Sequence, residues 1–117
     1  MAKKILVVED EVEIRTFFVT VLKDMKFKTI EASDGKEGLE KFLFEHPDLV
    51  LTDFNMIPMD GIQMTRKIRE VDEKVPIIFI TGYIQNTKEA LDAGANRVIA
   101  KPIDPEVLEK TCQRLLG

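Results

Sequence analysis

The sequence of 117 residues has no tryptophan and only one cysteine, one histidine and one tyrosine. With Cys112 alone, no disulfide can form within the chain, so we expect a reducing compartment. The apolar helical pattern around Cys112 predicts a buried thiol. Every apolar run is far shorter than the roughly 20 residues needed to cross a bilayer. We therefore expect neither a membrane span nor a secretory signal, and a soluble, cytoplasmic protein that does not contact membranes.

Basic residues are not concentrated in any one segment. The 17 lysines and arginines are scattered among 21 acidic residues, and the formal net charge is −4. Proteins that bind nucleic acid directly carry a basic stripe or patch, so we expect no direct contact with nucleic acid. An apolar content of 44% with only 6 glycines and 5 prolines is typical of a folded domain. We expect one domain that spans residues 1–117.

Short apolar runs alternate five times with stretches in which apolar residues recur at helical spacing. Asp34 and Asp104 stand where helix caps are expected, and Leu39, Phe42 and Leu43 are expected to be buried by the second helix. This alternation predicts an α/β fold in which helices cover both faces of a parallel sheet. The predicted strands are residues 5–8, 27–30, 49–52, 77–80 and 98–100.

The first, third and fourth runs are apolar almost throughout, as strands covered on both faces are. The second run alternates and the fifth is short, so these two are expected at the edges. The predicted strand order is therefore 2-1-3-4-5, a doubly wound sheet. Ligands bind such sheets at the carboxyl ends of the strands, beside the point where the order reverses.

Polar side chains follow four of the five predicted strands. Glu9 and Asp10 follow the first strand, Asp53 the third, Thr81 the fourth and Lys101 the fifth. Two like charges about 4 Å apart repel by roughly 4 kcal/mol at an effective dielectric near 20. The three carboxylates therefore need a cation or a raised pKa, and Mg²⁺ is the ion that takes carboxylate and phosphate oxygens together.

These residue types suit the transfer of a phosphoryl group to Asp53. Its carboxylate would attack phosphorus, while Lys101 and the metal neutralise charge on the transferred oxygens and Thr81 offers a hydroxyl. Gly82 leaves space for the incoming group. An acid that ends a strand is more often a turn residue, and Lys101-Pro102 is a common loop dipeptide. It is therefore the joint placement after different strands that indicates a site.

Four segments, ILVVEDE, LVLTDFNMIPMDG, IIFITG and AGANRVIAKPID, resemble the receiver domain of two-component response regulators. The resemblance covers residues 4–116 and includes the single-domain regulators of chemotaxis and sporulation. It implies a flavodoxin-like fold and a role in signal transduction or a phosphorelay. A sensor histidine kinase or histidine phosphotransfer protein would phosphorylate one aspartate. The domain, which is not itself an enzyme, would then act on an unknown output protein or domain.

The resemblance also implies how the metal is held. By this resemblance Asp53 would be the phosphoacceptor, and Asp10, Asp53 and the backbone carbonyl of Asn55 would be Mg²⁺ ligands. Glu9, one methylene longer than the aspartate often found there, would reach the ion through water. These roles make Mg²⁺ the expected cofactor.

Phosphorylation adds negative charge and acceptor oxygens. The resemblance implies that Thr81 and Lys101 respond by moving toward the phosphoryl group. The surface expected to bind the output partner lies on the fourth helix, the fifth strand and the fifth helix, and includes Lys88, Leu91 and Arg97.

Two features depart from the family pattern. The proline that commonly lies four residues after the acceptor is replaced by Ile57, and Pro58 follows instead, so the loop is expected to bend differently. Val98 stands where an aromatic residue is frequent, three residues before Lys101. The aromatic part of the usual switch is therefore expected to be altered. Tyr83 is either a gate for water or an exposed loop residue.

Other functions share parts of the pattern. A phosphatase of the haloacid dehalogenase type normally has a second acid two residues after its nucleophile, where this chain has Asn55. A flavodoxin-like electron carrier needs a phosphate cradle after the first strand, and the acidic residues 9–11 would repel phosphate. A receiver-like module that is never phosphorylated stays open. His46 precedes Pro47 and is expected in a loop, not as a phosphoryl donor. We expect a stand-alone receiver or the amino-terminal part of a longer regulator.

Overall fold

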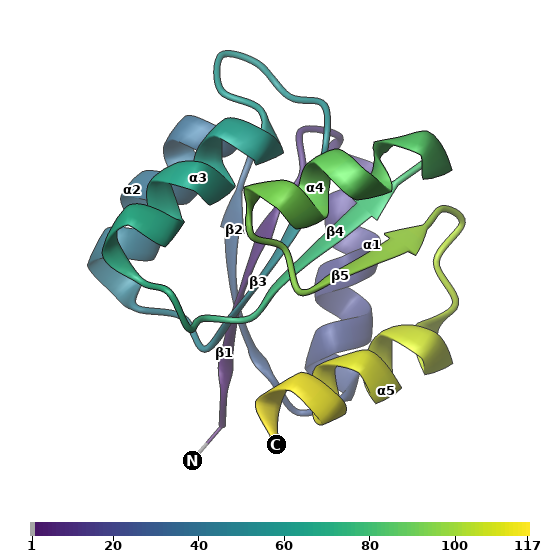
Figure 1. Ribbon diagram of the computed structural model, residues 1–117. Coiled ribbons are helices and arrows are strands. Elements are labelled where there is room, and N and C mark those ends of the chain that lie inside the picture. Colours follow the sequence, from purple (N-terminus) through teal and green to yellow (C-terminus); the bar gives the residue numbers. More distant parts are fainter. Residues whose placement is uncertain (1) are drawn as a thin grey trace.

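The computed structural model describes residues 2–117, with every side chain except that of Ile84. Its five strands form one parallel sheet in the order β2-β1-β3-β4-β5, seen obliquely in Figure 1. The strand order and the edge positions of β2 and β5 confirm the sequence prediction. The strands are β1 Lys4–Val8, β2 Lys28–Ala32, β3 Leu49–Asp53, β4 Ile77–Thr81 and β5 Arg97–Ala100.

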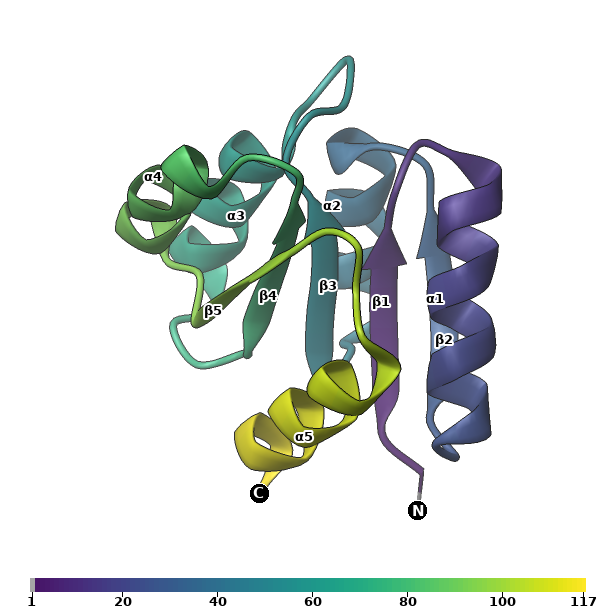
Figure 2. The same cartoon turned by 90° about the vertical axis from the view of Figure 1, so that its right-hand side faces the viewer.

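Helices cover both faces of the sheet, as Figure 2 shows. Two helices, α1 and α5, pack on one face, and α2, α3 and α4 pack on the other. Within residues 2–117, no helix combines the length and the apolar character needed to span a bilayer. The helices are α1 Val12–Asp24, α2 Gly35–Glu45, α3 Gly61–Val71, α4 Thr87–Ala93 and α5 Pro105–Leu116, with a 3₁₀ turn, η1 Ile84–Asn86, before α4.

Aspartate side chains cap three of the helices. Asp34 accepts hydrogen bonds from two backbone N–H groups of the first turn of α2, at 2.7 and 3.0 Å. Asp104 accepts one such bond, from the Glu106 N–H of α5 at 2.9 Å, where Pro105 occupies the first helical position, and Asp60 caps α3. The caps at Asp34 and Asp104 were predicted from the sequence. They fix where α2 and α5 begin.

The core has two layers because successive side chains of a strand point to opposite faces. Leu6 and Val8 pack beneath α2, α3 and α4, whereas Ile5 and Val7 pack beneath α1 and α5. Cys112 lies in the second layer, fully buried, and burial raises the pKa of its thiol to about 12. The prediction of a buried cysteine is confirmed.

Two details of the sequence prediction were wrong. Leu43 was expected to be buried, but it is 50% exposed. Gly35, Gly38 and Phe42 form the buried stripe of α2, and Leu43 lies about 100° around the helix from Phe42. The second strand begins and ends later than its apolar run. As an edge strand it pairs only with β1, so its limits follow that partner, residue for residue.

Candidate functional site

The carboxyl ends of four strands form one open cleft. Parallel register places Val8 beside Thr52 and Thr81 beside Ala100, so the residues that end or follow these strands come together. The cleft has a volume of about 470 Å³. It contains five of the six predicted site residues, while Glu9 lies beneath it. The lining residues are Asp10, Glu11, Asp53, Asn55, Thr81, Gly82, Tyr83 and Lys101.

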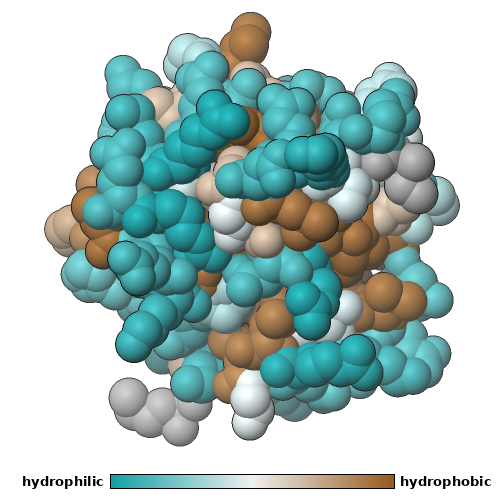
Figure 3. Space-filling model, in the orientation of Figure 1, coloured by the Kyte–Doolittle hydropathy of each residue, from teal (hydrophilic) through white to brown (hydrophobic). Residues whose placement is uncertain are grey.

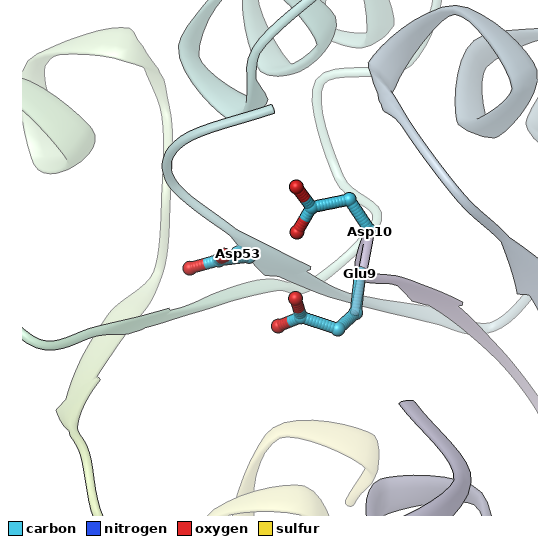
Figure 4. A group of neighbouring side chains, drawn as sticks. All are labelled: Glu9, Asp10 and Asp53. Carbon is cyan, nitrogen blue, oxygen red and sulfur yellow. The ribbon is translucent and has the colours of Figure 1, made fainter. Parts of the chain in front are cut away.

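Three carboxylates converge at the cleft, as Figure 4 shows. Glu9, Asp10 and Asp53 each offer an oxygen that lies within 4.8 Å of the others. Asp10 is exposed, Asp53 has a side chain 12% exposed, and Glu9 is fully buried. The Asp53 carboxylate is oriented by a hydrogen bond of 2.8 Å from the backbone N–H of Phe54.

Lys101 faces two of these carboxylates. Its Nζ lies 3.4 Å from Asp53 Oδ1 and 3.7 Å from Glu9 Oε1. The backbone N–H of Lys101 donates to the Thr81 carbonyl at 2.8 Å, which fixes the residue at the end of β5. One ammonium against three carboxylates leaves excess negative charge in the cleft.

Glu9 is the carboxylate of the cluster whose charged form is least favourable. Its Oε2 accepts a hydrogen bond of 3.1 Å from the backbone N–H of Glu11, but no donor among residues 2–117 bonds Oε1. Burial raises its pKa to about 7; Asp10 and Asp53 act in the same direction, against the Glu11 bond and Lys101. A buried oxygen without a donor, beside two further carboxylates, provides the all-oxygen ligands that a hard divalent cation requires. The residues therefore fit a magnesium ion.

The Thr81 hydroxyl connects the cleft to the segment that leads into α4. It accepts a hydrogen bond of 3.0 Å from the Tyr83 N–H and donates to the Tyr83 carbonyl at 3.3 Å. The same carbonyl accepts from the Asn86 N–H of η1 at 3.1 Å. A displacement of this hydroxyl toward the cleft therefore breaks a bond to the β4–α4 loop. Tyr83 itself lies at the cleft rim and is 57% exposed.

The β3–α3 loop contains the shifted proline. Phe54 and Met56 are buried, whereas Asn55 and Ile57 point outward, and Ile57 is 86% exposed. In Figure 3, hydrophobic atoms project at the top of the molecule, where this loop lies. The two buried side chains anchor the loop, so Asn55 stays at the cleft although the proline is displaced. The other departure, Val98, is half-buried against the core.

Arg15 contacts the site, but no pattern in the sequence predicted this contact. Arg15 donates from Nη1 to the Glu9 carbonyl at 2.7 Å and from Nε to Glu31 at 3.1 Å. Charge alone does not distinguish Arg15 from the other helical arginines. In contrast, the residues expected on the output surface lie on α4 and β5 and do not line the cleft: Lys88, Leu91 and Arg97.

A family model for the response regulator receiver domain matches residues 5–113. The chain belongs to this receiver family. The receiver is 31% identical over 118 residues to the sporulation initiation phosphotransferase F of Bacillus subtilis. That match covers 99% of this chain and 95% of the relative. It is 37% identical over 116 residues to a protein named as a probable transcriptional regulator of Cyanophora paradoxa. That match covers 97% of this chain but only 48% of the regulator, so the receiver spans about half of that relative.

A solved structure supports the same family. The receiver domain of a sensor histidine kinase from Pseudomonas aeruginosa superposes with a TM-score of 0.93 at 28% identity, covering 100% of this chain and 99% of that one. Its crystal structure contains a magnesium ion coordinated in the active site cleft. The predicted family, flavodoxin-like fold and place in two-component signalling are confirmed for this receiver, which is a signalling domain.

Proposed function

We propose that Asp53 of this receiver accepts a phosphoryl group from a phosphohistidine on a sensor kinase or a histidine phosphotransfer protein. The observation that carries the proposal is the convergence of three carboxylates, two of which face Lys101, with a buried Glu9 oxygen that has no hydrogen-bond donor among the described residues. Such a cluster is costly to maintain unless a cation and an anionic substrate complete it.

Each residue has a defined task in this transfer. A carboxylate oxygen of Asp53 attacks phosphorus, the P–N bond to the donor imidazole breaks, and its electron pair returns to the imidazole nitrogen. Lys101, 3.4 Å from Asp53, is placed to pair with an oxygen of the transferred group. Thr81 donates its hydroxyl to another oxygen. The chain's own chemistry ends at the aspartyl phosphate, so we propose an acceptor and switch and not an enzyme that turns over.

We propose that Mg²⁺ is held by Asp10, Asp53 and the backbone carbonyl of Asn55, with Glu9 contributing through water. When bound, Mg²⁺ neutralises charge on the transferred oxygens. Asp10, Asp53 and Asn55 line the cleft, and the carboxylate of Glu9 lies beside those of Asp10 and Asp53 in Figure 4. The three carboxylates among them also supply the negative charge that draws a divalent ion.

The phosphorylated state is read by a partner. When Thr81 turns to the phosphoryl group, the Tyr83 carbonyl loses one of its two donors, and the loop before α4 can change position. The surface of α4, β5 and α5 is therefore proposed to bind the unknown output partner, with Lys88, Leu91 and Arg97 exposed on it. We propose that residues 1–117 act as one domain in the cytoplasm, in keeping with the buried free thiol.

A second surface suits the phosphoryl donor. An apolar hollow of about 440 Å³ lies between α1 and the loop that follows β5, and it is lined by Glu13, Ile14, Phe17, Phe18, Lys101, Pro102 and Ile103. Because Lys101 also lines the cleft, a protein seated in the hollow would place a phosphohistidine beside Asp53. Phe17, 43% exposed, is the aromatic side chain available to that donor.

Small-molecule phosphorylation tests the proposal directly. Incubation with acetyl phosphate and Mg²⁺ should add one phosphoryl group by mass, and the Asp53→Asn variant should remain unmodified because it lacks the nucleophile. EDTA should prevent the reaction. Asp24→Asn, an exposed aspartate at the end of α1, is the matched control and should be labelled like the wild type. Labelling that survives Asp53→Asn, or that needs no divalent ion, would contradict the assignment.

A further inference from the structure

The loop between β3 and α3, residues 54–60, is held closed at its base. The Gly61 N–H donates to the Phe54 carbonyl at 3.0 Å. The Phe54 ring packs edge-to-face against Phe79, with ring centroids 5.8 Å apart. Met56 is buried in the same core. The first half of the loop, which carries Asn55, is therefore fixed by its own side chains.

The second half of the loop is fixed by a glycine of another helix. The N–H of Gly35, the first residue of α2, donates to the Met59 carbonyl at 2.8 Å. A β-carbon placed on Gly35 would lie 2.5 Å from the Met59 carbonyl oxygen and 2.8 Å from that of Asp60. Both atoms belong to the backbone, which cannot rotate away as a side chain does. Only glycine permits this approach of α2 to the loop.

The last residue of the same segment, Gly61, lies against the end of β3. A β-carbon on Gly61 would collide with the carbonyl oxygen of Asp53. Residues 59–61 therefore fill the gap between the start of α2 and the end of β3. A group added at Gly35 must push this segment toward Asp53, or push α2 away and release the loop. Either displacement acts on the backbone directly before Asn55, because the Gly61 N–H bonds the Phe54 carbonyl and Gly61 lies against the Asp53 carbonyl.

We infer that Gly35 is a positioning residue for the metal site. Its missing side chain sets the spacing between α2 and the loop, and thereby holds the oxygens of Asp53 and Asn55 in place toward a divalent cation. The inference rests on the proposed function, since it concerns the magnesium ion assigned there. Groups that orient metal ligands from outside the coordination sphere typically affect metal affinity about 10- to 100-fold.

Gly38 provides a matched control on the same helix. A β-carbon there would meet the Met64 sulfur at 2.7 Å and a Val8 methyl at 3.0 Å. These are side-chain atoms of the core, and the end of Met64 can rotate. Gly38→Ala therefore disturbs packing beneath α2 without contacting residues 59–61. In Gly35→Ala the added methyl group clashes with the backbone of that segment.

The test is the Mg²⁺ dissociation constant of the full chain, measured by calorimetric titration for wild type, Gly35→Ala, Gly38→Ala and Asp10→Ala. We expect Gly35→Ala to bind Mg²⁺ about 10-fold more weakly and Gly38→Ala to stay within about twofold of wild type. Thermal unfolding in EDTA shows whether each variant is folded. Equal affinities for wild type and Gly35→Ala, or equal losses in the two glycine variants, would overturn the inference.

A measurement on the wild type covers the case in which Gly35→Ala does not fold. Mg²⁺ should slow hydrogen exchange of the Gly35 amide, which bonds the loop, relative to the Gly38 amide, which bonds the carbonyl of the capping residue Asp34 at 2.9 Å. Unchanged exchange at both amides, or equal slowing, would contradict the inference. If wild type and Asp10→Ala bind Mg²⁺ equally poorly, the metal site of the proposed function fails as well. Normal wild-type binding with an unaffected Gly35→Ala overturns only the role of Gly35.

Discussion

Glu9 is the residue at which burial and charge oppose each other most strongly. It is fully buried beneath the cleft, and its pKa is raised from 4.5 to about 7, chiefly by burial. Without a metal, the carboxyl therefore takes up a proton that the unfolded chain releases at lower pH. Because the pKa of Glu9 differs between the folded and unfolded states, the free energy of unfolding depends on pH.

The sign of this dependence follows from the direction of the pKa shift. Between pH 4.5 and 7 the folded protein binds more protons than the unfolded chain, so the free energy of unfolding falls as pH rises through that window. At about 1.4 kcal/mol per pKa unit, the loss in EDTA-treated protein amounts to about 3 kcal/mol. Glu9→Gln, which cannot titrate, should remove it. Urea unfolding of both proteins at pH 5 and pH 8 measures the difference.

Added Mg²⁺ provides the control for the Glu9 experiment. An ion that binds only the folded state stabilises it, so Mg²⁺ should restore wild-type stability at pH 8. Parallel pH profiles for wild type and Glu9→Gln in EDTA would show that Glu9 does not carry the proton uptake.

Among single residues, those with charged or polar side chains at the site were easier to predict than a glycine whose role depends on its lack of a side chain. Asp53, Thr81 and Lys101 meet because the carboxyl ends of parallel strands lie at one edge, a rule that sequence order alone can use. The contact between Gly35 and Met59 joins segments far apart in the chain and depends on the path of a loop. Nothing in the local sequence encodes that path.

Among the elements, α3 and α4 are joined at their carboxyl ends by one arginine. Arg69 donates to the Gly94 carbonyl from Nε at 3.0 Å and from Nη2 at 2.8 Å, and Nη2 also bonds Asn96 Oδ1 at 3.0 Å. The same Asn96 oxygen accepts from the Ile77 N–H at 2.9 Å. Arg69 therefore fixes the end of α4 against the starts of β4 and β5, at the opposite end of β4 from Thr81.

Removal of this clamp should loosen α4 selectively. Hydrogen bonds to a charged group contribute about 1.5 to 3 kcal/mol, so Arg69→Ala should lower the free energy of unfolding by about 2 kcal/mol. Amide exchange should accelerate most in α4. Arg66→Ala removes an exposed arginine from the same helix and should change stability by less than about 0.5 kcal/mol. Chemical denaturation with residue-resolved exchange measures both; similar losses in the two variants would contradict the clamp.

The elements themselves followed from the sequence better than their limits did. Capping aspartates and apolar runs predicted the central strands and the starts of α2 and α5. Tertiary pairing decides the rest: β5 begins at Arg97 because that residue pairs with Ile78 of β4, although its side chain is exposed. The role of Arg69 could not be predicted from the sequence either, because its partners are a carbonyl and a side-chain amide from a turn 25 or more residues away.

On the scale of the whole molecule, two exposed phenylalanines mark opposite sides of the sheet. Phe17 lies on α1, beside the apolar hollow and Lys101, and is 43% exposed. Phe44 lies on α2, on the other face, and is 83% exposed. The two side chains have the same chemistry and differ in their distance from the cleft lining, so they form a matched pair for locating the donor surface.

Phosphoryl donors of two sizes separate the chemistry of Asp53 from the docking of a protein. Acetyl phosphate needs only the cleft, so Phe17→Ser and Phe44→Ser should both be labelled at the wild-type rate. A phosphorylated histidine phosphotransfer protein must also cover the rim. Truncation of a side chain that anchors an interface costs more than 1 kcal/mol, so Phe17→Ser should accept the group about 10-fold more slowly while Phe44→Ser is unaffected. Rapid-quench measurement of receiver phosphorylation gives both rates.

Two outcomes would contradict this prediction. A slower transfer to Phe44→Ser from the phosphotransfer protein would show that the donor docks on the α2 side. A slow reaction of Phe17→Ser with acetyl phosphate would indicate a damaged cleft instead of a lost contact.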